Sequence, residues 1–148
     1  MIRDEHLREI LEAARLAPSA NNSQVWRFFL TRQRPEITWL ASLANKPSFL
    51  SAPLILVAMA EPWIIGTRGK EQPFFMIDVP IALSHIILKS VEYGMSVALC
   101  FDFDEEKLLG TISDMLKNSR GKTLPTRERA VALVAIGYAE QSKKPQRG

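Results

Sequence analysis

Residues 4–17 carry apolar side chains at three- and four-residue intervals, with charged side chains on the other faces. Asp4 stands where an N-cap residue would accept a hydrogen bond from the backbone of a new helix. The pattern predicts an amphipathic first helix. The helix is expected to stop at residues 18–22, because Pro, Ser and Asn favour turns over helix continuation. The apolar face consists of Leu7, Ile10, Leu11, Ala14 and Ala17.

Four short segments have the composition of strands. Residues 26–31 are aromatic, and residues 53–60 form a continuous apolar run typical of a strand buried on both faces. Residues 96–101 and 130–138 are also short and apolar. Residues 61–75 show no periodicity and contain two Pro and two Gly, so they predict a loop or short insertion.

Three further helices are expected between these strands. One covers residues 36–50 and is interrupted by Pro47, and another covers residues 105–116. The third covers residues 78–93, with Asp78 as its cap and Gly94 as its end. Its apolar residues cover most of the circumference, so we expect it to be the central buried helix. They leave a polar stripe of Asp78, His85, Lys89 and Glu92.

The alternation of helices and strands predicts a three-layer α/β/α sandwich, with helices on both faces of a sheet. A chain of 148 residues with 47% hydrophobic and 24% charged residues fits a single soluble domain over residues 1–148. No apolar run approaches the ~20 residues of a membrane helix, and the polar start is unlike a signal peptide. We therefore expect no membrane partner and a cytoplasmic location.

The cysteine and histidine content excludes several chemistries. Cys100 is the lone cysteine, which rules out an intrachain disulfide and favours a reducing compartment. In an apolar strand it is more typical of a core residue than of a nucleophile. No His, Asp or Glu grouping has the spacing of a metal site, and no Gly-x-Ser-x-Gly motif is present. We predict no metal and no catalytic side chain, so redox chemistry would need a borrowed cofactor.

The net charge of +3 is unevenly distributed, because basic residues outnumber acidic ones only after residue 116. A basic end can attract nucleic acid, an acidic partner or a phosphate-bearing cofactor, but a solvated surface is the commoner explanation. No basic stripe interleaves with aromatic residues. Nucleic-acid binding is therefore not expected.

Residues 12–28 carry the most specific pattern, Glu-Ala-Ala-Arg-Leu-Ala-Pro-Ser-Ala-Asn-Asn-Ser-Gln-Val-Trp-Arg-Phe. From the residues alone, this is a helix end, a polar turn and the start of a strand. The segment closely resembles the signature of the flavin-dependent nitroreductase family, with Val25 where the family usually has Pro. The resemblance implies an α+β, nitroreductase-like fold with a central, mostly antiparallel sheet. It also implies that Pro18, Ser19, Asn22 and Gln24 contact the flavin mononucleotide (FMN) of a partner subunit, as polar groups suited to a ring edge or ribityl chain.

Two later segments extend the resemblance. Residues 78–96 are similar to the family's central helix and the turn that follows it, where Met95-Ser96 replaces Leu-Gly. This similarity implies that Gly94 and Ser96 lie beside the flavin, although Gly94 is equally well explained as a helix C-cap. Residues 132–138 resemble the family's last core strand. The family then turns basic residues toward the FMN phosphate, and Lys144 and Arg147 are the candidates. The tail, about 140–148, is equally compatible with disorder.

Two features of the family are missing from this sequence: an Arg-Arg-Ser-like motif before the first helix and a long C-terminal arm. The resemblance implies an FMN-dependent oxidoreductase that acts as a homodimer. Such an enzyme passes reducing equivalents from NADH or NADPH through the flavin to a nitro compound, quinone or similar small-molecule acceptor. The alternative is a flavin-free scaffold that keeps the fold and the dimer interface as a binding module, and the missing arginine motif is its best argument. A nucleic-acid-binding domain ranks last.

Overall fold

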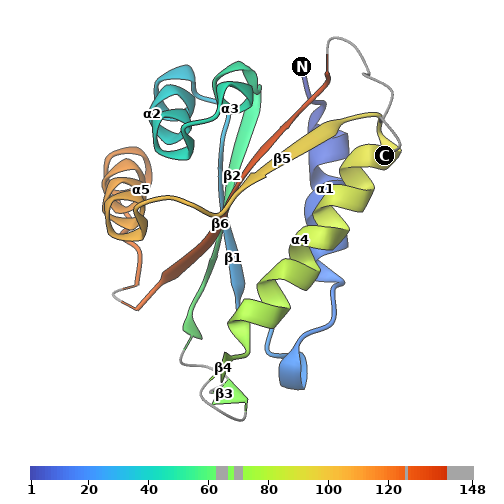
Figure 1. The fold of residues 1–148 in the computed structure, drawn as a ribbon, viewed down its shortest axis with the longest axis vertical. Helices are drawn as coiled ribbons and strands as arrows, with labels where there is room; N and C mark the ends of the chain where they lie inside the picture. The colour runs from blue at the N-terminus through green and yellow to red at the C-terminus, as the bar shows by residue number, and fades with distance from the viewer. Residues whose placement is uncertain (63–66, 69–71, 126, 140–148) are drawn as a thin grey trace.

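The computed structural model describes residues 1–62, 67–68, 72–125 and 127–139 (Figure 1). The tail with Lys144 and Arg147 lies outside the described residues, so the prediction for these two side chains stays a prediction. The helices are α1 (Asp4–Arg15), the 3-10 turn η1 (Ala20–Asn22), α2 (Arg34–Ala44), α3 (Pro47–Ser51), α4 (Phe75–Glu92) and α5 (Glu105–Arg120). The strands are β1 (Trp26–Thr31), β2 (Leu54–Ala60), β3 (Thr67–Arg68), β4 (Gln72–Pro73), β5 (Ser96–Cys100) and β6 (Arg129–Gly137).

The main sheet has four strands in the order β1-β2-β6-β5, and every neighbouring pair is antiparallel. In the register, Trp26 pairs with Ala60, Leu54 with Ile136, and Ser96 with Gly137. Every residue of β2 is buried. Its central place between β1 and β6, under helices on both faces, explains why its sequence is a continuous apolar run.

The helices lie on both faces of this sheet (Figure 1). One layer contains α1 and α4, and the opposite layer contains α2, α3 and α5. Alternate strand residues feed two separate cores: Leu54 and Leu56 pack toward α1 and α4, whereas Ile55 and Val57 pack toward the other helices. The predicted α+β sandwich with an antiparallel sheet is confirmed.

Several predicted helix boundaries differ from the structure, including the end of α5, which runs to Arg120 rather than residue 116. Pro47 does more than interrupt a helix: α2 ends at the left-handed Asn45, and Pro47 starts the separate helix α3. Asp4 does not cap α1, because its carboxylate pairs with Arg32 instead. Asp78 is not the cap of α4 either; the helix starts at Phe75, and Asp78 lies within its first turn.

The end of α4 agrees with the sequence. Gly94 has a left-handed backbone (φ 72°), and its N–H donates to the carbonyl of Val91. The N–H of Met95 donates to the carbonyl of Ser90. These two bonds form a Schellman motif, in which glycine tolerates the left-handed position without the steric cost of a Cβ.

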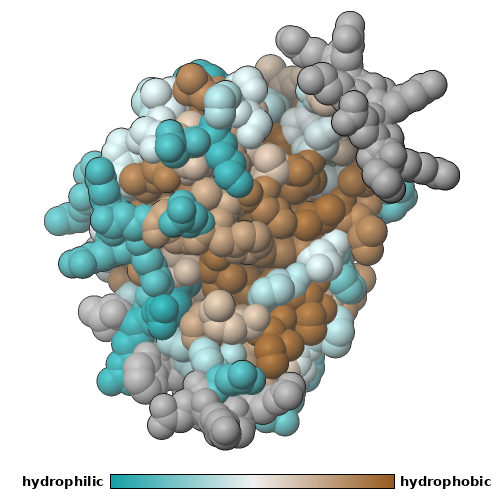
Figure 2. All heavy atoms as spheres, in the orientation of Figure 1, coloured by the Kyte–Doolittle hydropathy of each residue, from teal (hydrophilic) through white to brown (hydrophobic). Residues whose placement is uncertain are grey.

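The expectation that α4 is a central buried helix is wrong for the single chain. Leu88 is 71% exposed and Val91 is 57% exposed. Figure 2 shows hydrophobic residues gathered on the surface over α4. Most of the polar stripe, in contrast, faces inward: Asp78 is buried, and His85 and Lys89 contact α1. Glu92 at its end is exposed. Periodicity revealed two kinds of face on this helix, but it did not reveal which face meets the neighbouring helix.

Cys100 is buried in β5, as expected for a core residue, and its thiol donates to the carbonyl of Ala44 at 3.7 Å. Among the described helices, none has the length and apolar character needed to cross a membrane.

Candidate functional site

Residues 18–24 form a short loop between α1 and β1. Its two ends are fixed by buried apolar residues, Ala17 and Val25, each 3% exposed. Val25 thus fills a core position at the place where the motif usually has Pro. Between these anchors the chain makes the single 3-10 turn η1, and Pro18, Asn22 and Gln24 are exposed to solvent. The loop is therefore a polar surface held on a rigid base.

Three residues of this loop have left-handed backbones, Asn21 (φ 52°), Asn22 (φ 54°) and Gln24 (φ 50°). Asn adopts this conformation more readily than most residues, but Gln has no such preference. A non-glycine residue held in a sparsely populated region costs of order 1–3 kcal/mol, and such positions cluster at functional sites. The surrounding structure must therefore hold the backbone of the loop in this conformation.

Hydrogen bonds connect three of the four predicted loop residues. The Ser19 hydroxyl accepts from the backbone N–H of Gln24 at 3.0 Å, and the Gln24 side-chain amide donates to Asn22 Oδ1 at 3.3 Å. The structure therefore brings Ser19, Asn22 and Gln24 together, and Pro18 precedes them at the end of α1. The remaining amide and hydroxyl groups of this cluster face solvent in the single chain.

A fifth residue fixes this loop, and the sequence did not identify it as part of a site. Both carboxylate oxygens of Asp78 accept from the backbone N–H of Ala20 at 3.1 Å, across 58 positions of the chain. About two helical turns further along α4, His85 Nδ1 lies 3.0 Å from the carbonyl oxygen of Ala13. The available signal was the polar stripe on α4, in which Asp78 faces the loop and His85 faces α1.

The predicted residues Gly94 and Ser96 lie at the other end of α4. At 1.5 Å per residue, Gly94 is about 24 Å from Asp78 along the helix axis. Within one chain, the loop and the turn at Gly94 cannot both touch the ring system of one small ligand. The Ser96 side chain shares its strand face with Ala98 and Cys100 and lines a cavity of about 200 Å³ with Ser48 and Ser51 of α3. Only its backbone belongs to the turn beside α4.

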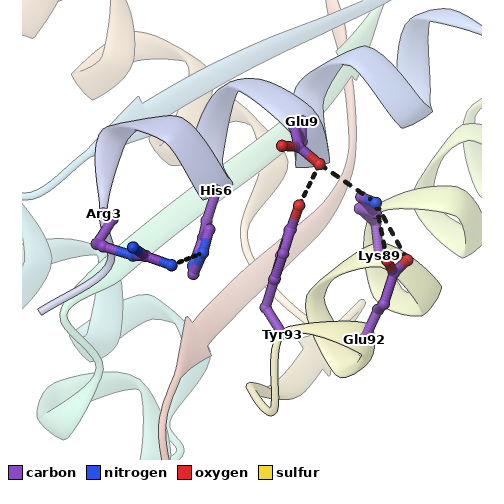
Figure 3. Close-up of polar contacts among 6 residues, drawn as sticks. All are labelled: Arg3, His6, Glu9, Lys89, Glu92 and Tyr93. Atoms are coloured by element: carbon purple, nitrogen blue, oxygen red, sulfur yellow. Dashed lines mark hydrogen bonds and ion pairs between the residues drawn. The ribbon is translucent and has the colours of Figure 1, made fainter.

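A polar cluster beside Gly94 joins α1 to the last turn of α4 (Figure 3). The Tyr93 hydroxyl donates to the Glu9 carboxylate, and Lys89 Nζ lies 3.3 Å from Glu9 and 3.1 Å from Glu92. The His6 ring stacks on Tyr93 with centroids 3.9 Å apart. The sequence pointed to Lys89 and Glu92 but gave no sign that Glu9 and Tyr93 would complete the cluster.

The cluster shifts the titration of its members. The hydrogen bond from Tyr93, followed by that from Lys89, lowers the pKa of Glu9. The same bond raises the pKa of Tyr93, and the bond to Glu92 raises the pKa of Lys89. Lys89 therefore stays a cation and Glu9 an anion throughout the neutral range. The cluster therefore fixes helix α1 against α4 through charged and hydrogen-bonded side chains.

A buried carboxyl group lies at the start of β6, on the α5 side of the sheet. The Glu128 side chain is 1% exposed, and neither carboxylate oxygen has a hydrogen-bond partner among the described residues. Its nearest cation is Arg27, whose Nε lies 3.7 Å away and which also bonds Glu61 at 2.9 Å. Burial raises the pKa of Glu128, with the Arg27 charge opposing the shift.

Replacing Glu128 by Gln is expected to raise the melting temperature by a few degrees at pH 7.5. A raised pKa in the folded state means that folding favours the neutral carboxyl, so wild-type stability falls as pH rises above the ordinary Glu value. The amide keeps the shape and stays neutral. The difference should shrink below about pH 4.5, where both side chains are neutral. Thermal unfolding of both proteins between pH 4 and 8 measures it; a lower melting temperature for Glu128→Gln at pH 7.5 would contradict this account.

Comparison with known protein families finds a match in the segment that contains this loop. The model of the nitroreductase family matches residues 1–42, which include α1, the loop and β1. A protein of Archaeoglobus fulgidus with the provisional name NADH dehydrogenase/NAD(P)H nitroreductase is 26% identical over 145 residues. That alignment covers 96% of this chain and 77% of the relative. The chain is therefore similar to the nitroreductase family, over its first 42 residues by the family model and along nearly its whole length by these relatives.

Solved structures of the nitroreductase family have the same fold. A family protein from Clostridium novyi NT is 26% identical, with a TM-score of 0.78 over 93% of this chain and 76% of that one. An FMN-dependent nitroreductase from Clostridium difficile R20291 is 24% identical, with a TM-score of 0.75 over 97% of this chain and 80% of that one. The sandwich described above is therefore the nitroreductase fold.

The chemistry of the loop can be compared with that of FMN. Ser19, Asn22 and Gln24 offer neutral donors and acceptors, which suit the alternating carbonyl and N–H groups of an isoalloxazine edge or the hydroxyls of a ribityl chain. Residues 18–24 contain no cationic side chain, so the loop has no partner for a phosphate. The described loop fits the uncharged parts of FMN and leaves its phosphate to other residues.

Proposed function

We propose that this chain is an FMN-dependent oxidoreductase that takes electrons from NADH or NADPH and delivers them to a nitro compound, quinone or similar acceptor. Similarity to the nitroreductase family supports the class of reaction. The observation that carries the proposal is the loop itself. Its left-handed residues and the bonds that link Ser19, Asn22 and Gln24 hold a neutral hydrogen-bonding edge open to solvent.

In this proposal the protein residues bind and orient, and no side chain acts as a nucleophile or general base. FMN, when bound, accepts a hydride from the nicotinamide and passes two electrons to the acceptor. Ser19, Asn22 and Gln24 hold the ring edge or ribityl chain, and the backbone at Gly94 is the candidate contact on the other side. Lys144 and Arg147 remain the candidates for the phosphate.

We further propose that the active form is a homodimer built on α4. The loop and the Gly94 turn lie at opposite ends of the α1–α4 pair, so a complete site needs two chains. A twofold axis across α4 makes the two helices antiparallel, and the loop of one chain then lies beside the Gly94 turn of its partner. The exposed apolar residues of α4 supply the contact: Met76, Ile77, Leu88 and Val91.

The oxidoreductase reading predicts that FMN-loaded protein is bleached by nicotinamide. After removal of free flavin, anaerobic titration with NADH or NADPH is expected to abolish the absorbance of oxidised flavin at one equivalent per flavin. Addition of a nitroaromatic or a quinone should restore it, because each reoxidation removes two electrons. A stable yellow protein that neither nucleotide bleaches would contradict the proposed oxidoreductase activity. The chain would then be a flavin-binding module without that activity.

A second candidate, the flavin-free scaffold, has one structural observation in its favour. Part of the hydrogen-bonding capacity of the loop is already used internally, since Asn22 Oδ1 and Ser19 Oγ both accept from Gln24. A loop satisfied in this way can persist without a ligand. Protein that stays colourless after incubation with excess FMN, while remaining folded and dimeric, would favour this candidate over the enzyme.

A further inference from the structure

Asp78 is a buried carboxylate that accepts a hydrogen bond from outside its own helix. Its residue is 2% exposed, and it stands in the first turn of α4, where the positive end of the helix dipole favours a negative charge. Both oxygens accept from the single N–H of Ala20, at 3.1 Å each. A hydrogen bond from an amide to an ionised acceptor is among the stronger bonds in proteins. Asp78 is therefore a firm attachment point between α4 and the loop.

Ala20 is the first residue of η1, and its N–H has no partner within that turn. The buried residues Ala17 and Val25 fix the two ends of the loop, and Asp78 fixes its middle. The left-handed residues Asn21, Asn22 and Gln24 follow directly after this attachment. Strained conformations of this kind persist only where the surroundings hold them, so release of Ala20 would let the loop relax.

We propose that Asp78 is a positioning residue for the flavin loop: it contacts no ligand, but it sets where Ser19, Asn22 and Gln24 stand. The proposal rests on the proposed function above. It makes α4 the common support of both half-sites, because its first turn holds the loop through Asp78 and its last turn leads into Gly94. A loop that is already held in place loses less conformational entropy when it binds a ligand than a free loop does.

The test compares Asp78→Ala and Asp78→Asn with the matched control Thr31→Val. Thr31 is also buried, and its hydroxyl also accepts from a backbone N–H, that of Gln33 at 3.0 Å, but it lies at the far end of β1. Circular dichroism and thermal unfolding establish that each variant is folded. Asp78→Asn keeps one acceptor oxygen, so it provides a milder variant if Asp78→Ala unfolds.

Two readouts apply: amide hydrogen exchange across residues 20–24 without flavin, and FMN affinity by quenching of flavin fluorescence. We expect Asp78→Ala to speed amide exchange at Ala20. We also expect it to weaken FMN binding by about tenfold, because the free energy of one lost hydrogen bond no longer orders the loop before binding. Asp78→Asn should fall between it and wild type. Thr31→Val should lower stability while leaving both readouts unchanged.

A double-mutant cycle separates positioning from general destabilisation. If Asp78 acts through the loop, then Asp78→Ala adds little to the loss already caused by removing the Asn22 and Gln24 side chains. Additive losses, or an unchanged FMN affinity in Asp78→Ala, would overturn the proposal. If wild type binds no FMN, the proposed function fails by itself; the exchange rate at Ala20 then decides whether Asp78 anchors the loop.

Discussion

Replacing Leu88 and Val91 of α4 by glutamate is expected to convert the proposed homodimer into a monomer. These side chains are 71% and 57% exposed in the single chain and lie one turn apart on the outer face of the helix. Burial of such a side chain stabilises a complex by about 1.5 kcal/mol, so four of them in a twofold interface contribute about 6 kcal/mol. Their loss corresponds to a dissociation constant larger by on the order of 10⁴.

The same variant is expected to lose FMN, although none of its substitutions touches the loop. The reason is geometric: in the proposed homodimer, the loop of one chain and the Gly94 turn of the other form one site. Leu50→Glu is the matched control, because Leu50 is also an exposed apolar residue (49%) but lies in α3, on the opposite layer. Analytical ultracentrifugation and a flavin titration measure both effects. A Leu88→Glu/Val91→Glu protein that remains dimeric would show that another surface forms the interface.

Removal of the two amide side chains of the loop should have the second largest effect. Asn22→Gly together with Gln24→Gly keeps the left-handed backbones, which glycine adopts freely, and deletes only the hydrogen-bonding groups. Two hydrogen bonds at about 1 kcal/mol each predict a loss of about 30-fold in FMN affinity. The fold should persist, because both side chains are exposed.

Asn45→Gly provides the control for this loop variant. Asn45 is likewise an exposed asparagine with a left-handed backbone (φ 48°), but it ends α2 on the other face of the sheet. Its replacement should leave FMN affinity unchanged. Equal FMN affinity in wild type and in the Asn22→Gly/Gln24→Gly variant, by fluorescence titration, would remove these side chains from the proposed site.

Strands marked by a short aromatic or apolar run could be predicted from the sequence. The bounds of β1 match the aromatic run of residues 26–31, and the apolar run before Glu61 is the fully buried β2. The loop was predictable because Pro18, Ser19 and the Asn residues stop a helix, and because the motif they belong to is specific. Gly94 was predictable as a helix end from its own conformational freedom.

Features that depend on which surfaces meet could not be predicted. Leu88 and Val91 have the composition of core residues, and only the position of α1 decides that they face outward. Asp78 resembled a helix cap, because sequence spacing cannot show that Ala20, 58 positions away, supplies the donor. Glu128 carried no signal either, since its burial follows from the packing of β6 beside Arg27. Contacts distant in sequence set the roles of all these residues.

The most direct test of this account is the absorbance spectrum of the purified chain after incubation with excess FMN and removal of free flavin. The account predicts a yellow protein with one FMN per chain, in particles with the mass of a dimer. A colourless protein that is folded and dimeric would contradict it, and the chain would then be a nitroreductase-fold scaffold without flavin.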